Sequence, residues 1–297
     1  CHTRRRKLFL NPKRLSKGSP KLKKLMNEDS KSMVKIQVPT MADLAAQGKT
    51  PEILFWVGCA GSFDQRYQKV TRAFVRILEH VGVGYAVLGP EESCTGDPAK
   101  RAGDEMTFQM QALANIAVLN GYEVKKIVTA CPHCFNTLKN EYPDLGGNYE
   151  VIHHSQFLDQ LIASGRLVVQ EDAALAQGGL TFHDSCYLSR ANGVYEAPRR
   201  VIESLKVEIR EMKRSRSKGL CCGAGGAQMF KDSEPGNKEI NVERTEEALG
   251  TGAKTIAVGC PFCLTMILDG VKHQNQEEKV KVFDIAELIA HAKGLNG

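Results

Sequence analysis

The sequence lacks any apolar run approaching the roughly 18 residues that a membrane-spanning helix requires. It also shows no secretory signal, which would place a short apolar segment before a cleavage site of small residues. We therefore expect a cytoplasmic protein that contacts the inner membrane only through a partner. In that reducing compartment, clustered cysteines more often bind metal or carry redox chemistry than form disulfides, and the chain has ten cysteines.

Several enzyme signatures are missing as well. The sequence has no phosphate-binding Walker loop, no glycine-rich dinucleotide fingerprint after a strand and no Ser/His/Asp pattern, so these catalytic classes have no support. Aromatic residues are scarce at 6%, but 42% of the 297 residues are hydrophobic. A chain of this length and composition can bury a sizeable core and is expected to form two domains.

The chain beyond residue 32 also lacks an excess of basic residues, despite the formal net charge of +6 for the whole sequence. Residues 1–32 contain eleven Lys and Arg against two Asp and Glu, so this head carries +9 and the remainder carries about −3. No nucleic-acid partner is therefore expected. This head is expected to be disordered, so Cys1 is not expected to be a ligand. The alternatives are that the head docks on acidic lipid or on a partner, or that the native protein starts at Met33.

What the sequence does contain is an internal repeat of cysteines. Four cysteines of the first half recur in the second at a nearly constant separation: Cys59, Cys94, Cys131 and Cys134 match Cys186, Cys221, Cys260 and Cys263. Ser155 and Asp284 stand at the same separation as the matched Cys-x-x-Cys pairs and are expected to be matching helix N-caps. The recurrence indicates a tandem duplication.

Each half is expected to run strand, cysteine loop, helix, strand, cysteine loop, helix, strand, Cys-x-x-Cys, helix. In the first half, apolar runs predict strands at 53–57, 85–88 and 127–129, and amphipathic patterns predict helices at 67–81 and 105–119. This alternation predicts an α/β fold, with a small parallel sheet flanked by helices in each half. The cysteines follow strands, where such sheets place their sites.

The two cysteine-rich domains are expected at 50–164 and 180–293. Residues 165–179, which end in Gly178-Gly179, are the expected hinge between them.

Five cysteines of the second half are expected to converge: Cys186, the adjacent pair Cys221-Cys222, and Cys260-Pro-Phe-Cys263, with a long spacer before and after the pair. Structural zinc takes four ligands, whereas an iron-sulfur cluster can use a fifth thiolate, and adjacent cysteines can reach different irons. The glycines of the run 223–226 allow positive φ and let backbone amides approach an anionic cluster. A thioredoxin-type dithiol would explain only two of the five cysteines.

This pattern resembles the cysteine-rich domain shared by the B-type subunit of heterodisulfide reductase, glycolate oxidase iron-sulfur subunits and lactate-utilisation iron-sulfur proteins. The resemblance covers roughly residues 50–293 and rests on one cysteine, a spacer, Cys-Cys-Gly, a similar spacer and Cys-x-x-Cys. It implies a 4Fe-4S cluster of the non-cubane type on the five second-half cysteines. A cubane cluster or another metal is the alternative.

The first half departs from the family pattern because Cys94-Thr95-Gly96 stands where Cys-Cys-Gly is expected. A threonine hydroxyl is a poor iron ligand, so four cysteines remain: Cys59, Cys94, Cys131 and Cys134. Four thiolates suit a cubane 4Fe-4S cluster or zinc, and a relic site of reduced buried thiols is the alternative.

Cys94-Thr-Gly-Asp-Pro98 also resembles iron-sulfur proteins linked to electron-transferring flavoproteins and quinone reduction. Those relatives often carry a ferredoxin-like module with tightly spaced cysteines, and no such run exists here. The resemblance therefore implies a subunit whose ferredoxin-like or membrane iron-sulfur partner is a separate chain.

Several histidines lie near the cysteines. His133 inside the first Cys-x-x-Cys is expected to pack, because its counterpart is Phe262. His183-Asp184 either donates hydrogen bonds or protons to the site or satisfies the loop backbone. His153-His154, matched to Val282-Phe283, is expected to have a core or capping role. Pro132 and Pro261 are expected to open helices that face the site.

Three functions are compatible with these features. The first is an electron-transfer subunit between a flavoprotein or ferredoxin-type partner and a quinone or membrane partner, in which the cofactor does the chemistry. The second is catalysis at a non-cubane cluster, in a disulfide reductase or a 2-hydroxy-acid oxidase subunit. The third is a zinc-stabilised assembly module without redox activity.

Overall fold

The computed structural model of the chain describes residues 38–232 and 235–295. The expected head at 1–32, with Cys1, lies outside these residues. The first half consists of the following helices and strands: α3 Met41–Ala46, β1 Ile53–Trp56, α4 Gly58–Phe63, α5 Tyr67–His80, β2 Tyr85–Ala86, α6 Asp97–Arg101, α7 Glu105–Gly121, β3 Lys126–Thr129, α8 Pro132–Asn136, β4 Glu150–His153 and α9 His154–Ala163.

The second half repeats this alternation with fewer strands. Its elements are α10 Ala173–Gly178, β5 Leu180–Phe182, α11 Glu196–Glu203, α12 Ile240–Leu249, β6 Thr255–Val258, α13 Pro261–His273, β7 Lys281–Asp284 and α14 Ile285–Ala292. The expected hinge at 165–179 therefore contains a short helix, α10.

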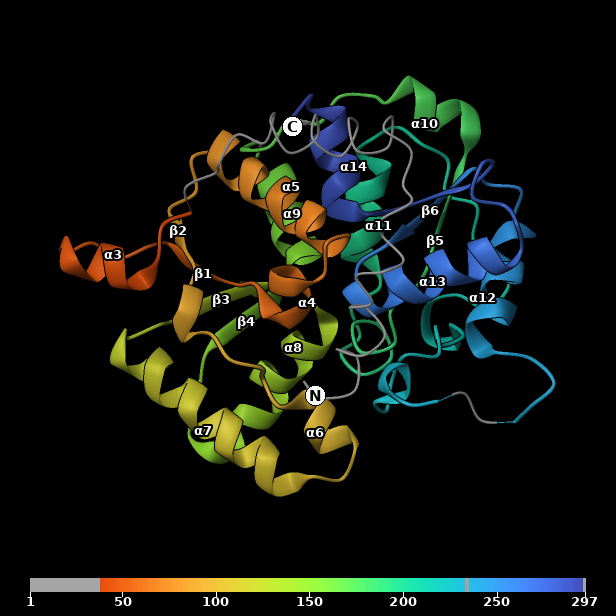
Figure 1. Cartoon of the computed structure of the whole chain (residues 1–297). Coiled ribbons are helices and arrows are strands. Elements are labelled where there is room, and N and C mark those ends of the chain that lie inside the picture. The colour runs from red at the N-terminus through yellow and green to blue at the C-terminus, as the bar shows by residue number, and fades with distance from the viewer. Residues whose placement is uncertain (1–37, 233–234, 296–297) are drawn as a thin grey trace, which may run out of the picture. The chain divides into compact units, whose positions relative to one another are not determined.

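Each half is built around its own parallel sheet. The first sheet has the order β2-β1-β3-β4 and the second has the order β5-β6-β7. The strands are short runs of apolar residues, and every residue of β1, β5 and β6 is buried. Helices cover the sheets, as Figure 1 shows. The expected α/β fold with parallel sheets flanked by helices is thus confirmed.

The expected strand before Cys221 is wrong, because only a single parallel bridge, between Leu180 and Ile209, takes its place. Beyond this bridge, backbone amides are bound by carboxylates in place of a neighbouring strand. The Arg214 amide donates to Glu247, and the Arg216 amide donates to Asp184 at 2.7 Å. Side chains distant in sequence therefore end the pairing early.

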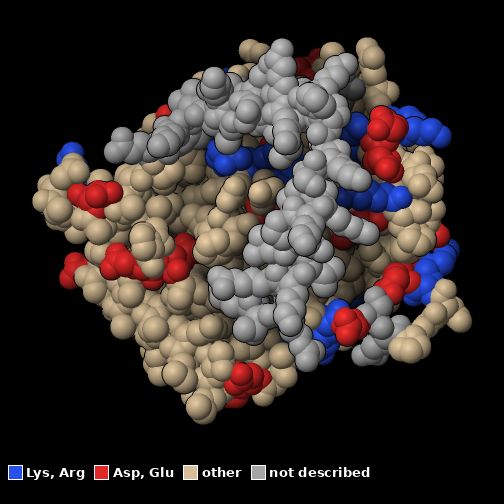
Figure 2. All heavy atoms as spheres, viewed as in Figure 1, with Lys and Arg blue, Asp and Glu red and all other residues tan. Residues whose placement is uncertain are grey.

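Helix α7 is unusual because it is apolar on more than one side. Phe108 and Leu119 are buried against the first sheet, but Met106 is 75% exposed and Met110 64% exposed. In Figure 2 the surface over α7 carries few charged side chains, whereas both signs of charge are interspersed around α12 and α13. None of the helices in the described ranges is long and apolar enough to cross a membrane.

The two halves pack against each other through two helices of each repeat. Helix α5 of the first half packs on α14, and α9 packs on α11 (Figure 1). The Arg66 guanidinium forms two hydrogen bonds, of 2.6 and 2.7 Å, with the Glu287 carboxylate and a third with the Val282 carbonyl. The described residues of both halves therefore belong to one compact unit.

Candidate functional site

The cysteines lie beyond the carboxyl ends of the central strands. Cys59 and Cys131 follow β1 and β3, and Cys186 and Cys260 follow β5 and β6. In the first sheet, β2 and β3 flank β1 on opposite sides, so the direction of winding reverses between β1 and β3. Open parallel sheets place binding sites at such a reversal. In the second sheet, the single bridge between Ile209 and Leu180 stands in place of the strand on the other side of β5, and the cysteines again follow the strand ends.

In the second half, the structure brings all five expected cysteines together. The sulfur atoms of Cys222 and Cys263 lie 3.3 Å apart. Further hydrogen bonds between the thiols link Cys186 to Cys221, Cys221 to Cys222, and Cys260 to Cys263. Cys222, Cys260 and Cys263 are buried and the other two are partly exposed. The five sulfurs thus form one connected group.

The glycine-rich loop supplies backbone donors to this group. Gly223 has a φ of +91° and donates its amide to the Cys221 sulfur at 3.3 Å. A Cβ at this position would also lie 3.2 Å from the Cβ of Ile240. Hydrogen bonds from the thiols of Cys186 and Cys222, and then from the amides of Gly223 and Gly225, lower the pKa of Cys221. The loop therefore favours the thiolate that a metal requires.

In the first half, all four expected cysteines line a single pocket: Cys59, Cys94, Cys131 and Cys134. Their thiols pair as Cys59 with Cys94 and Cys131 with Cys134. Thr95 lines the same pocket and its hydroxyl lies 3.9 Å from the Cys134 sulfur. This contact is the counterpart of the Cys222–Cys263 contact. The threonine therefore occupies the place of the fifth cysteine.

An acidic side chain that the sequence analysis did not single out supports this pocket. The Glu92 carboxylate accepts the amides of Val57 and Gly58 ahead of Cys59, and burial raises the pKa of Glu92 to about 7. The hydrogen bond from Cys59 lowers the pKa of Cys94 to about 7. The only sequence signal for Glu92 is its position shortly before a cysteine.

The two sites meet at their Cys-x-x-Cys turns. His133 of the first turn and Phe262 of the second are in edge contact, with ring centroids 4.8 Å apart. The His133 Nδ1 lies 2.8 Å from Asp97, and the ring also hydrogen-bonds the Cys260 sulfur. Burial opposes ionisation of Cys260, but hydrogen bonds from Cys263 and His133 lower its pKa to about 5. A residue of the first cysteine turn therefore directly contacts a sulfur of the second group.

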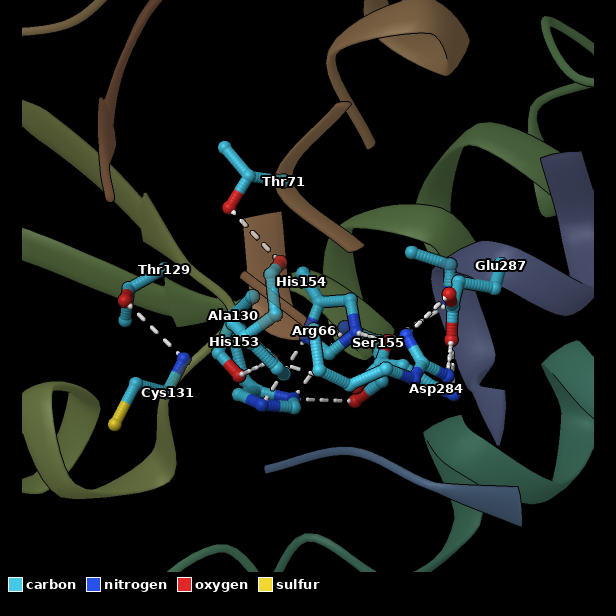
Figure 3. A network of polar contacts seen from close by, with 12 residues as sticks. Arg66, Thr71, Thr129, Ala130, Cys131, His153, His154, Ser155, Asp284 and Glu287 are labelled. Carbon is cyan, nitrogen blue, oxygen red and sulfur yellow. Dashed lines mark hydrogen bonds and ion pairs between the residues drawn. The ribbon is translucent and has the colours of Figure 1, made fainter. Parts of the chain in front are cut away.

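A polar network with His153, His154 and Asp284 fully buried lies behind the turns (Figure 3). His153 hydrogen-bonds His154 at 3.2 Å, and His154 hydrogen-bonds Asp284 of the other half at 2.9 Å. His153 also hydrogen-bonds the backbone of Ala130 and Gly259, the residues that precede Cys131 and Cys260. The network thus links the two cysteine turns.

The expected pairing of the N-caps is corrected by the structure. His153, and not Ser155, caps α9, as Asp284 caps α14. The capping role expected for the histidine pair is confirmed for His153, but its counterpart is Asp284, and not Val282. The connection between β6 and β7 is longer than that between β3 and β4, and a separation carried over from the cysteines could not reveal this.

His183 and Asp184 have different surroundings. Asp184 forms two hydrogen bonds with Arg199 and accepts the Arg216 amide, so it satisfies the loop, which was one of the two expectations. The His183 Nδ1 accepts a hydrogen bond from Arg244 at 2.9 Å. Burial, and then the charge of Arg244, lowers the pKa of His183 to about 3. No pattern in the sequence indicated Arg244, because it is distant from His183 along the chain.

The side chains present fit a thiophilic metal or cluster. Each site gathers four or five cysteine sulfurs, and soft thiolates select zinc or iron-sulfur clusters over hard cations. A ring nitrogen of His183 and the sulfurs of Cys222 and Cys263 also lie within 4.8 Å of one another. Pro132 and Pro261 open α8 and α13, as expected.

Comparison with known proteins shows the same duplication. The family model described as "Cysteine-rich domain" (CCG) matches residues 53–139 and again 180–268. The chain is 46% identical over 257 residues to the probable iron-sulfur-binding oxidoreductase FadF of Bacillus subtilis, covering 86% of this chain and 36% of that protein. It is 44% identical over 252 residues to the EtfAB:quinone oxidoreductase of Syntrophomonas wolfei, covering 83% and 35%.

A more distant relative is a subunit of the dihydromethanophenazine:CoB–CoM heterodisulfide reductase of Methanosarcina barkeri, 33% identical with coverage of 82% of this chain and 60% of that protein. The fold resembles that of a hypothetical protein from Helicobacter pylori, with a TM-score of 0.52, 9% identity and coverage of 94% of this chain and 55% of that one. The chain spans little more than a third of the length of the first two relatives. On the two family matches, together with the duplicated cysteine sites, the chain belongs to the cysteine-rich domain (CCG) family.

Proposed function

We propose that the chain is an iron-sulfur electron-transfer module of an oxidoreductase. The observation that carries this proposal is the contact between the two thiol groups, in which His133 of the first Cys-x-x-Cys turn meets Phe262 and Cys260 of the second. Two redox centres held that close would exchange electrons directly. The names of the relatives, an iron-sulfur-binding oxidoreductase, a quinone oxidoreductase and a heterodisulfide reductase, support it.

The proposed ligand set is the one expected from the sequence. Cys186, Cys221, Cys222, Cys260 and Cys263 would hold a 4Fe-4S cluster, for which a non-cubane form is proposed because five thiols are available. Cys59, Cys94, Cys131 and Cys134 would hold a second 4Fe-4S cluster or zinc. The domains carrying them are proposed at 50–164 and 180–293.

When bound, a cluster supplies reversible one-electron transfer. The chain's own residues hold it, exclude water and set its electrostatic surroundings. Burial of Cys222, Cys260 and Cys263 keeps solvent from the second site, and the amides of the 223–226 loop stabilise negative charge on its sulfurs. These features suit a centre that changes charge without exchanging ligands with solvent.

The proposed partners are a flavoprotein or ferredoxin-type donor on one side and a quinone or membrane acceptor on the other. The similarity to the EtfAB:quinone oxidoreductase supports the quinone side of this assignment. Another relative is named as a probable membrane-anchored ferredoxin, and the chain is 44% identical to it over 262 residues. That name supports a ferredoxin-type partner near a membrane.

One observation favours catalysis as a second candidate function. The first site opens into a pocket at which Cys59 is exposed, whereas the second site is mostly buried. A small substrate such as a disulfide would meet the first site directly. A disulfide that is reduced by the protein, and that changes the spectrum of its centres, would support this candidate over pure electron transfer.

The deciding experiment measures iron, zinc and acid-labile sulfide per chain after purification without oxygen. About eight irons support two 4Fe-4S clusters, and about four support one. Cys222→Ala and Cys94→Ala form the matched pair that assigns iron to the second or the first site. If the protein contains zinc but neither iron nor sulfide, the electron-transfer proposal is overturned and the zinc-stabilised assembly module becomes the function that fits.

A further inference from the structure

A buried side-chain nitrogen without a partner stands at the same position in each half. Trp56 and His183 have the same separation as Cys59 and Cys186, and each precedes its cysteine by the same short step. Both side chains are fully buried. Within the described part of the chain, the Trp56 Nε1 and the His183 Nε2 have no hydrogen-bond partner. Buried polar groups are rarely left unpaired, so a partner is expected there.

The hydrogen bond from Arg244 determines which nitrogen of His183 carries the proton. A guanidinium nitrogen has hydrogens and no acceptor lone pair, so the Arg244 Nε donates and the His183 Nδ1 accepts. The neutral ring must then carry its proton on Nε2. Arg244 is itself held by the Arg214 carbonyl at 2.8 Å and by the Glu247 carboxylate at 3.0 Å. The tautomer is therefore built into the fold.

The free nitrogen lies at the second cysteine group. A ring nitrogen of His183 and the sulfurs of Cys222 and Cys263 lie within 4.8 Å of one another. Because Nδ1 is occupied by Arg244, Nε2 is the nitrogen left to face the sulfurs. A protonated nitrogen has no lone pair for a metal, so this grouping is a donor set beside a cluster and not a ligand triad.

We infer that His183 donates its Nε2–H to a sulfur of the second-half cluster, either a sulfide or the thiolate of Cys222 or Cys263, and that Arg244 holds the donor tautomer. The inference rests on the proposed function, which supplies the cluster. Reduction adds negative charge to the cluster, so a hydrogen bond to its sulfur stabilises the reduced state more than the oxidised state. His183 is thus a positioning residue that raises the reduction potential.

The test combines a redox titration with a measurement of nitrogen coupling. His183→Phe removes the donor, whereas His183→Gln places an amide N–H near the position of Nε2. We expect His183→Phe to lower the midpoint potential of the second-half centre. We expect His183→Gln to keep a potential near that of the unchanged protein. With ¹⁵N-labelled histidine, pulsed EPR of the reduced His133→Phe variant, which lacks the other histidine that contacts this sulfur group, should show the weak coupling of a hydrogen-bonded nitrogen.

Iron and sulfide are measured on every sample, so that failure of the role of His183 can be distinguished from failure of the electron-transfer function. Full iron with equal potentials in the three proteins overturns the role of His183 and leaves the electron-transfer function intact. A strong nitrogen coupling would make His183 a ligand and overturn the inference as well. If His183→Phe does not retain iron, the coupling in the His133→Phe variant decides. Unchanged protein without iron overturns both.

Discussion

Thr95 shows how one side chain distinguishes the two halves of the duplication. It occupies the place of Cys222, is buried to a similar degree and contacts Cys134 as Cys222 contacts Cys263. A hydroxyl is a hard and weakly acidic group, so it cannot replace a thiolate on iron. The glycine that follows keeps the same left-handed conformation in both halves, with φ of +88° at Gly96 and +91° at Gly223, so the turn is shared while the ligand chemistry differs.

We expect reciprocal exchanges to transfer the properties of one site to the other. Thr95→Cys supplies a fifth thiol to the first site, so this site should gain the EPR features of the second site and bind iron in preference to zinc. Cys222→Thr should have the opposite effect. Iron, zinc and sulfide analysis with EPR measures both.

Ser93→Cys is the matched control for this exchange, because it adds a thiol next to Cys94. The Ser93 side chain bonds Asn115, away from the sulfurs, so its metal content should not change. Metal content and spectra that stay the same in both exchanges would contradict the equivalence of Thr95 and Cys222.

At the scale of elements, the N-caps of α9 and α14 begin their helices and also connect the two halves. His153 and Asp284 both form capping boxes and both enter the buried network between the halves (Figure 3). Burial, and then the nearby His154, holds the pKa of His153 well below its usual value. The folded protein therefore keeps His153 neutral where an unfolded chain would bind a proton.

His153→Asn should make stability less dependent on pH. A depressed histidine pKa means that the unfolded chain binds more protons below about pH 6.5, so the free energy of unfolding falls on acidification by about 1.4 kcal/mol per pH unit for each such histidine. Asparagine is a good N-cap and does not titrate. Urea unfolding of unchanged and variant protein between pH 5 and 8, without oxygen, measures the two slopes.

The slope in the His153→Asn variant should be smaller but not zero, because His183 also has a depressed pKa. The stability near neutral pH is expected to fall, since His154 loses a hydrogen bond. Equal slopes in the two proteins would show that His153 does not control the acid response.

Local patterns in the sequence predicted most elements but not the contacts between them. The strand at 53–56 and the helix at 67–80 agree with the expected ranges to one residue, because apolar periodicity is a local signal. The strand before Cys221 was predicted wrongly, because a carboxylate far along the chain binds its backbone, and the N-cap of α9 was predicted wrongly, because a separation taken from the cysteines pointed to Ser155. Arg244 was missed because it is distant from His183 along the chain.

At the scale of the whole described unit, charged pairs join the halves at two places. Arg66 binds Glu287 in a partly buried position, and Arg200 binds Asp159 in a more exposed one. Both pairs connect a helix of one half to a helix of the other, with Arg66 as the N-cap of α5. Burial strengthens such pairs because water screens them less, and removing one partner leaves the other without its hydrogen bonds.

Arg66→Met should therefore destabilise the protein more than Arg200→Met does. We expect a loss of about 1–2 kcal/mol for Arg66→Met, between the values typical of exposed and of buried pairs. The exposed pair serves as the control and should have a smaller effect. Denaturant unfolding of the two variants measures the difference, and equal losses would contradict the importance of burial at this junction.

The contact between His133 and Cys260 predicts that the halves act on each other's centres. His133 belongs to the first Cys-x-x-Cys, yet its ring hydrogen-bonds a sulfur of the second group. His133→Phe keeps an aromatic ring, which the matching position already accommodates as Phe262, but removes that donor. The reduction potential of the second-half centre should therefore fall, although the substitution lies in the first half.

A redox titration that follows the EPR signal of each centre measures this effect. Asp97→Asn is the matched control, because it removes the charge behind His133 but leaves the imidazole next to Cys260. It should shift the second-half potential less than His133→Phe does. If His133→Phe shifts only the first-half centre, then the hydrogen bond does not couple the halves, and their proximity alone would have to carry electrons between them.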